Sequence, residues 1–177
     1  MLRNDFDKLS LKKIVFITLS LLLAVSFWNC EKDDICAEGT PTTPRVIIEF
    51  YDATATTTLK NVTSLGVIEP TFATGFAFTA VSKIQVPLRT NATTTTLNFI
   101  QNGSDTDTSN DNIDAVTFNY ATSDVYISRA CGYKTLFYLD PTTPVNLATD
   151  GNNWIQNIVV TQPDIENENE VHVKIYF

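Results

Sequence analysis

Residues 45–177 are predicted to form an all-β domain, a two-layer antiparallel β-sandwich that is immunoglobulin-like in a loose sense. Two observations support this prediction. Apolar and polar residues alternate with a period of two in several short runs, as in strands with one buried face. These runs are rich in Thr, Val, Ile and aromatic residues, and turn-forming Asn, Asp, Gly and Pro separate them. Seven to nine such strands are typical of a sandwich, with a small barrel as the alternative.

The expected strands follow one another from Arg45 to the C-terminus. In the first strand, Val46, Ile48 and Phe50 share one face. Leu59–Ile68 fits a helix or a strand, and the threonines before it and Gly66 within it favour the strand. The remaining strands are expected at Thr95–Ile100, Ala115–Tyr120, Asp124–Ser128, Tyr133–Leu139, Ile155–Val160 and Glu170–Phe177.

The N-terminal segment, residues 1–29, is predicted to be a signal peptide whose core is helical. Lys12 and Lys13 precede an apolar run of 15 residues, Ile14–Trp28. A bilayer-spanning helix needs about 20 residues, so the run fits the core of a signal peptide better than a membrane anchor. An uncleaved anchor is one alternative. Another is a soluble product that is cleaved near Ala24-Val25-Ser26.

Cys30 follows the apolar run and is the predicted site of lipidation. Residues 26–30 resemble a lipobox, in which the cysteine is acylated and becomes the new N-terminus, although the residues before Cys30 are larger than usual. Each buried acyl methylene contributes about 0.8 kcal/mol, so two or three chains would hold the protein firmly. The sequence therefore predicts a lipoprotein of the outer membrane.

Residues 30–44 are expected to be an acidic, Pro- and Thr-rich tether. Lys32, Asp33 and Asp34 resemble an export signal that carries some bacterial lipoproteins to the outer face of the outer membrane. The alternative is a solvated charged tether that no receptor reads. Both display at the cell surface and display toward the periplasm therefore stay open.

The charge of the chain limits its partners. The 177 residues carry a net charge of −8, and the leader holds four basic and two acidic residues, so the remaining 148 residues carry −10. Nucleic acid is an unsuitable partner for so acidic a protein, because Lys and Arg contacts to phosphate supply most of the affinity. The expected partners are the membrane, through the lipid, the lipoprotein export machinery, and an envelope protein or glycan.

Two cysteines, Cys36 and Cys131, remain when Cys30 is assigned to the lipid. An even pair in an oxidising compartment favours a disulfide over two free thiols. Their wide separation and the single histidine of the chain do not fit a zinc site.

Two cysteine motifs carry a family resemblance. Cys30–Cys36 (CEKDDIC) and Ser128–Lys134 (SRACGYK), together with Thr43-Pro44 and Phe50-Tyr51-Asp52, resemble an uncharacterised lipoprotein family of the Bacteroidota. The resemblance covers nearly the whole chain after the leader. It implies export and paired cysteines, and it implies no catalytic residue.

One stretch of the sequence has the spacing of a metal site. Asp105, Asp107 and Asp111, followed by Asp114, have the alternate spacing of a calcium loop. The glycine and the final glutamate of such a loop are missing, so an acidic hairpin loop is favoured. No cofactor is expected.

His172, the single histidine, lies in the phase opposite the neighbouring valines and is expected to face solvent or a loop. The sequence holds no Gly-x-Ser-x-Gly motif that would present a serine nucleophile to it.

Three functional classes fit these observations. The leading class is a non-enzymatic binding or structural module of the envelope. A carbohydrate-binding accessory protein would require coplanar aromatics on one sheet face, for which Tyr51, Tyr126, Tyr138 and Tyr176 are the candidates. A carboxylate-based hydrolase would require two acids that converge in a pocket.

Overall fold

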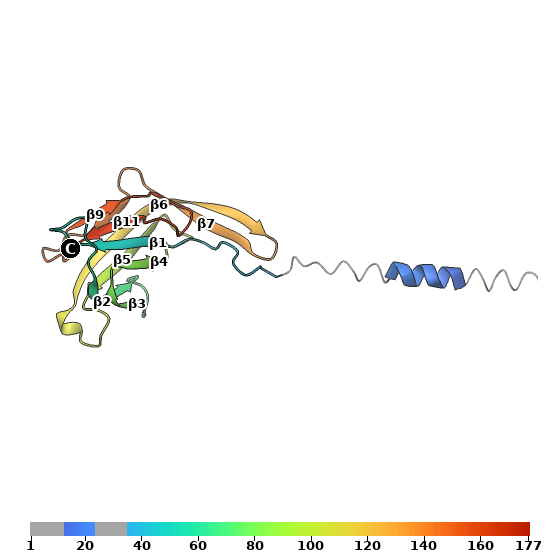
Figure 1. The fold of residues 1–177 in the computed structure, drawn as a ribbon, viewed down its shortest axis with the longest axis horizontal. Coiled ribbons are helices and arrows are strands. Elements are labelled where there is room, and N and C mark those ends of the chain that lie inside the picture. Colours follow the sequence, from blue (N-terminus) through green and yellow to red (C-terminus); the bar gives the residue numbers. More distant parts are fainter. Residues whose placement is uncertain (1–12, 24–34) are drawn as a thin grey trace, which may run out of the picture. The chain divides into compact units, whose positions relative to one another are not determined.

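The computed structural model describes residues 13–23 and 35–177 (Figure 1). Residues 13–23 are helical, and within the described residues no helix is long and apolar enough to cross a membrane. The chain divides into two units. The small unit combines the residues up to Glu38 with the separate segment Ser128–Cys131, and the large unit consists of Gly39–Ile127 and Gly132–Phe177. Cys30, Lys32, Asp33 and Asp34 lie outside the described residues.

The large unit contains a four-stranded sheet of order β4-β1-β11-β9. Its strands are β1 (Val46–Tyr51), β4 (Lys83–Val86), β9 (Asn157–Val160) and β11 (Val173–Tyr176). β1 pairs antiparallel with β4 and parallel with β11, with Phe50 opposite Ile175. The first and last strands of the domain are therefore neighbours at the centre of this sheet.

The second sheet has the order β10-β7-β6-β5-β2-β3, with β8 paired to β6. Its strands are β2 (Val62–Ile68), β3 (Phe76–Val81), β5 (Thr94–Gln101), β6 (Asn112–Ser128), β7 (Gly132–Leu139), β8 (Val145–Leu147) and β10 (Asp164–Ile165). The predicted all-β sandwich is confirmed. The described residues hold eleven strands instead of seven to nine, because the prediction missed β3, β4, β8 and β10.

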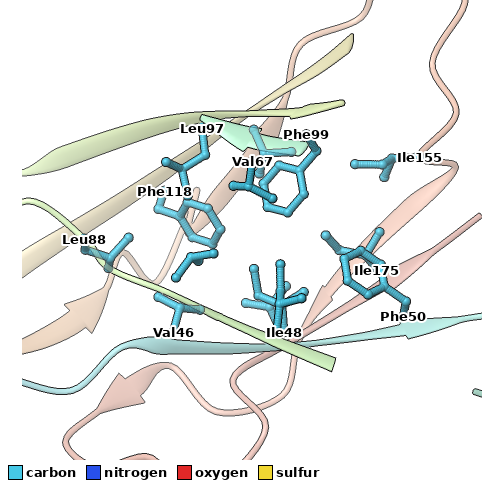
Figure 2. Close-up of a cluster of buried hydrophobic side chains, with 14 of the residues drawn as sticks. Val46, Ile48, Phe50, Val67, Leu88, Leu97, Phe99, Phe118, Ile155 and Ile175 are labelled. Carbon is cyan, nitrogen blue, oxygen red and sulfur yellow. The ribbon is translucent and has the colours of Figure 1, made fainter. Parts of the chain in front are cut away.

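The hydrophobic core lies between the two sheets. Figure 2 shows Val46, Ile48 and Phe50 on β1 facing Leu97 and Phe99 on β5 and Phe118 on β6. The face predicted for the first strand is therefore correct. These side chains are almost completely buried, and burial of apolar area at about 25 cal/mol per Å² is the main stabilising contribution to such a domain.

Strand β6 corrects the prediction of separate strands at Ala115–Tyr120 and Asp124–Ser128, because the two are one continuous strand. Ala121-Thr122-Ser123 contains neither glycine nor proline, so nothing in its covalent structure ends the strand. The register of β6 with β5 ends at Asn119, and its register with β8 ends at Phe118. Beyond these residues β6 continues with β7 as a hairpin, which extends past the neighbouring strands (Figure 1).

The prediction that His172 faces solvent is wrong, since its side chain is 1% exposed. β11 begins at Val173, so the alternation of the final strand does not extend back to His172. The imidazole Nδ1 accepts a hydrogen bond from the Ile47 N–H at 2.9 Å, and the His172 N–H donates to the Ile47 carbonyl at 3.0 Å. Burial lowers the pKa of His172 and favours the neutral imidazole that this hydrogen bond requires.

The small unit contains a disulfide between Cys36 and Cys131, whose Cα atoms are 4.8 Å apart. Cys131 ends the turn between β6 and β7, and its N–H donates to Ser128 Oγ at 3.0 Å. The bond therefore links the segment before the domain to the turn of the long hairpin.

Candidate functional site

A groove of about 500 Å³ opens in the large unit beside the first residues of β3. We call it the β3 groove. Its inner wall includes Val67 on β2 and Leu97 on β5, and its outer wall is the segment 87–91 between β4 and β5. Phe72 and Phe76 line its mouth and are 60% and 49% exposed. The lining is therefore mostly apolar although it is open to solvent.

The groove forms because β3 is the last strand of its sheet and keeps much of its surface exposed. Phe76 is opposite Val67 in the register of β3 with β2, and Phe78 is opposite Leu65, so the two phenylalanines follow a core-facing row. Their rings stack with centroids 6.3 Å apart. Only glycine fits at position 75, because a Cβ there would lie 2.4 Å from the Val67 carbonyl oxygen.

One ion pair lies at the polar rim of the groove. Arg89 Nη2 lies 3.0 Å from Glu69 Oε2, and it also donates to Thr71 Oγ1 at 3.1 Å. The Thr71 hydroxyl donates a short hydrogen bond to the same Glu69 oxygen. The hydrogen bond from Thr71 and the charge of Arg89 lower the pKa of Glu69, which keeps this carboxylate ionised at neutral pH.

A hydrogen-bond chain through the buried side chains of Thr95 and Tyr120 holds the outer wall in place. The Arg89 N–H donates to Thr95 Oγ1 at 2.9 Å, and the Thr95 hydroxyl lies 2.6 Å from the Tyr120 hydroxyl. Tyr120 in turn donates to the Arg89 carbonyl at 2.8 Å. Burial raises the pKa of Tyr120, so its hydroxyl stays protonated and can donate. The groove is thus a preformed feature of the fold.

A second candidate surface lies on the outer face of the four-stranded sheet. Tyr51 and Tyr176 are opposite one another in the β1–β11 register, and their ring centroids lie 5.6 Å apart at an interplanar angle of 32°. Lys174 Nζ lies 4.7 Å from the Tyr51 ring centroid, and the Tyr51 hydroxyl donates to Glu49 at 2.9 Å. A shallow pocket of about 360 Å³, lined in part by Asn157, adjoins Tyr176. We call this surface the tyrosine face.

The acidic loop uses its carboxylates for its own backbone. Asp105 Oδ1 accepts from the Asp107 N–H at 2.8 Å, and Asp107 Oδ1 accepts from the N–H and hydroxyl of Ser109 at the start of a short 3-10 helix, Thr108–Asn110. Within residues 13–23 and 35–177, no three His, Cys, Asp or Glu side chains gather closely enough to hold a metal ion. The calcium spacing of Asp105, Asp107 and Asp111 therefore does not form a ligand cluster.

Asp114 does not belong to the acidic loop. It lies on β6, and its side chain is completely buried. Asp114 Oδ2 accepts from the Ile155 N–H at 2.7 Å. Next to it, the Trp154 indole donates to the Phe99 carbonyl at 3.2 Å. Burial raises the pKa of Asp114. Asp114 thus fixes the 154–155 segment over the core, a structural role that the acidic spacing of the sequence does not indicate.

The β3 groove was not predicted from the sequence. Phe76 and Phe78 alternate with small residues, which is a signal for a half-buried strand that could have been recognised. No sequence signal pairs Glu69 with Arg89, because their contact depends on how the two segments fold. The two tyrosines of the tyrosine face were predicted as outward-facing candidates, and the structure brings Tyr51 and Tyr176 together.

The fold and these surfaces define a β-sandwich module that has an apolar groove at one sheet edge and an aromatic face on the other sheet. Residues 67–177 match the model of a family of unknown function, DUF6452. The chain belongs to this family. Comparison with the curated proteins and comparison with the solved structures each gave no match.

Proposed function

We propose that the protein is a lipid-anchored envelope module that binds an extended segment of another envelope protein at β3. The β3 groove is the observation that carries this proposal. It offers an apolar pocket of about 500 Å³ next to the edge of a sheet, and an added strand would place one bulky apolar side chain in the pocket while its backbone pairs with β3.

The composition of β3 supports a protein partner. Exposed edge strands are commonly protected by charged residues or proline, because an unprotected edge pairs with other chains. Residues 76–81, FAFTAV, contain neither. A binding role for this edge explains why it carries two phenylalanines and no protecting charge.

The chemistry of the groove supports binding instead of hydrolysis. Glu69 is the one carboxylate among the residues that line it, and Arg89 already neutralises that charge. A two-carboxylate hydrolase would need a second acid facing the same space.

Photo-crosslinking in intact cells tests this function. A photoreactive amino acid at Thr79, an exposed position of β3, should give a discrete adduct with an envelope protein. The adduct should disappear when Phe76→Ser is added, because the apolar contact in the groove is lost. The same probe at Thr57, an exposed position before β2, is the matched control. Absence of any Thr79-specific protein adduct would refute the proposal.

The anchor has its own test. In cells, Cys30→Ala should release the protein from the membrane fraction and stop its labelling by a palmitate analogue. Unchanged membrane association of the variant would contradict lipidation at Cys30.

A second candidate function is glycan binding, and the tyrosine face favours it. Two tyrosine rings, tilted by 32° to one another beside Lys174, Glu49 and Asn157, combine an aromatic surface with hydrogen-bond donors and acceptors, as recognition of a sugar requires. Affinity electrophoresis in gels that contain a bacterial capsular polysaccharide tests it. Retardation that Tyr176→Ala abolishes and Phe76→Ala preserves would support the glycan function, whereas equal mobility with and without polysaccharide would count against it.

A further inference from the structure

The turn between β6 and β7 is covalently close to the predicted lipid. Cys36 is six residues after Cys30, and six residues span at most about 21 Å when fully extended. The disulfide then brings the Cα of Cys131 to within 4.8 Å of the Cα of Cys36. The chain between Cys30 and Cys36, together with the disulfide, therefore limits how far the turn of the hairpin can lie from the acylated cysteine.

The hairpin end carries exposed aromatic residues. Tyr126 on β6 and Tyr133 on β7 are 53% and 68% exposed, and Tyr133 is two residues after Cys131. Their rings contact edge to face with centroids 5.3 Å apart. Tyrosine favours the membrane interface, because its ring is apolar and its hydroxyl can stay hydrated at the level of the lipid headgroups.

The tyrosine pair lies beyond the packed core of the domain. Tyr126 and Tyr133 share a hairpin face with Asp124 and Thr135, because side chains two residues apart on a strand point to the same side. The Thr135 hydroxyl donates to Asp124 at 2.7 Å, so this polar pair lies between the tyrosines and the core. Phe137, two residues after Thr135, is completely buried, whereas the tyrosines lie past the last residue of β6 that pairs with β5. They lie beyond the polar Asp124–Thr135 pair, on a part of the hairpin that no other strand covers among the described residues.

The charge of the hairpin end differs from that of the chain. Residues 124–136 contain Arg129 and Lys134 and one acidic residue, Asp124, and therefore carry a net charge of +1, whereas the whole chain carries −8. This local excess of positive charge removes the electrostatic penalty that an acidic hairpin would meet at an anionic headgroup layer. Because residues 31–34 are net acidic, the attraction must come mainly from the tyrosine rings and not from charge.

We propose that the β6–β7 hairpin end is a second membrane contact, in which Tyr126 and Tyr133 insert at the interface of the leaflet that holds the Cys30 lipid. This inference rests on the lipid anchor proposed above. The disulfide makes the insertion effectively intramolecular, so a weak contact by two rings is sufficient once the acyl chains are in place. The contact would also set the orientation of the domain, and with it the side on which β3 meets a partner.

Depth-dependent fluorescence quenching tests this contact. The lipidated Tyr133→Trp protein is reconstituted in phosphatidylcholine vesicles that contain lipids brominated near the headgroup. Its tryptophan emission should shift to the blue and should be quenched at least about twofold more than that of the matched Phe72→Trp control. Phe72 is a suitable control site because it is 60% exposed, close to the 68% of Tyr133, and lies in the loop between β2 and β3. The parent protein supplies the background of the buried Trp154.

The outcomes separate this inference from the anchor. Mass analysis of the N-terminal peptide first establishes whether acyl chains are present on Cys30, and their absence would overturn the anchor itself. With the lipid present, equal quenching of the two variants would overturn the hairpin contact alone. A Cys36→Ser/Cys131→Ser version of the Tyr133→Trp protein should lose the extra quenching while its lipid stays in the vesicle. Retained quenching would show that the disulfide does not position the hairpin.

Discussion

The stability of the domain should fall as pH decreases through the titration range of His172. The imidazole is buried, and its Nδ1 must stay unprotonated to accept the Ile47 N–H at 2.9 Å. Desolvation lowers the pKa of His172 and outweighs the opposing effects of Glu170, the Asn167 backbone and Glu168. The unfolded chain therefore binds the proton more readily than the folded domain does.

The magnitude follows from the unfolded state. An unfolded histidine titrates near pH 6.5, so protonation between pH 7.5 and pH 5.0 favours unfolding by up to about 2 kcal/mol at 25 °C. The loss begins as the pH falls through about 6.5 and continues until the folded protein also takes up the proton. His172→Asn is the matched variant, because its amide oxygen can accept the same hydrogen bond but does not titrate in this range.

Urea denaturation measures the effect across this pH range. Trp154 reports unfolding, since its ring is buried and contacts Phe50 and Phe177. Between pH 7.5 and pH 5.0, the wild-type protein should lose up to about 2 kcal/mol more stability than His172→Asn, because titration of every other group is common to both. Parallel pH profiles for the two proteins would refute the assignment to His172.

Three further predictions concern stability. The Cys36→Ser/Cys131→Ser protein should have a free energy of unfolding lower by up to about 4–5 kcal/mol, the chain-entropy estimate for a loop of 95 residues, and should unfold at a lower urea concentration. An unchanged midpoint would contradict this. Asp114→Ala should cost about 1–3 kcal/mol, since a buried N–H loses its acceptor, and calorimetry should show a lower Tm. Phe50→Ala should cost about 3–5 kcal/mol, whereas Phe72→Ala, at an exposed site, should stay within about 0.5 kcal/mol; similar losses for both would refute the packing argument.

Part of the fold is readable in the local sequence. Alternation predicts the strand around Val46, Ile48 and Phe50 and the face that it buries, because side chains on a strand point alternately to its two sides. The same signal fails at the edges of the pattern. It splits β6 where small residues interrupt the hydrophobic period, and it extends the last strand back to His172 where the chain is irregular.

Other features depend on contacts between distant segments. Nothing in the local sequence places β1 beside β11, since that parallel pairing joins the two ends of the domain. The burial of His172 follows from it, because the partner of the imidazole is the backbone of Ile47. The β3 groove likewise needs Arg89 to meet Glu69 across two strands and a turn.

The sequence by itself determined the sandwich class and the core face of β1, and it predicted the pairing of Cys36 with Cys131. The lipid site at Cys30 stays a prediction. The class and the core face follow from periodicity and composition, which act over a few neighbouring residues, whereas the cysteine pairing follows from the number of cysteines left once Cys30 is assigned. Only the tertiary structure decided which strands are neighbours, which face of β3 stays uncovered, and that Tyr126 contacts Tyr133 at the hairpin end. Those features arise from packing between segments far apart in the chain, where no local pattern specifies the partner.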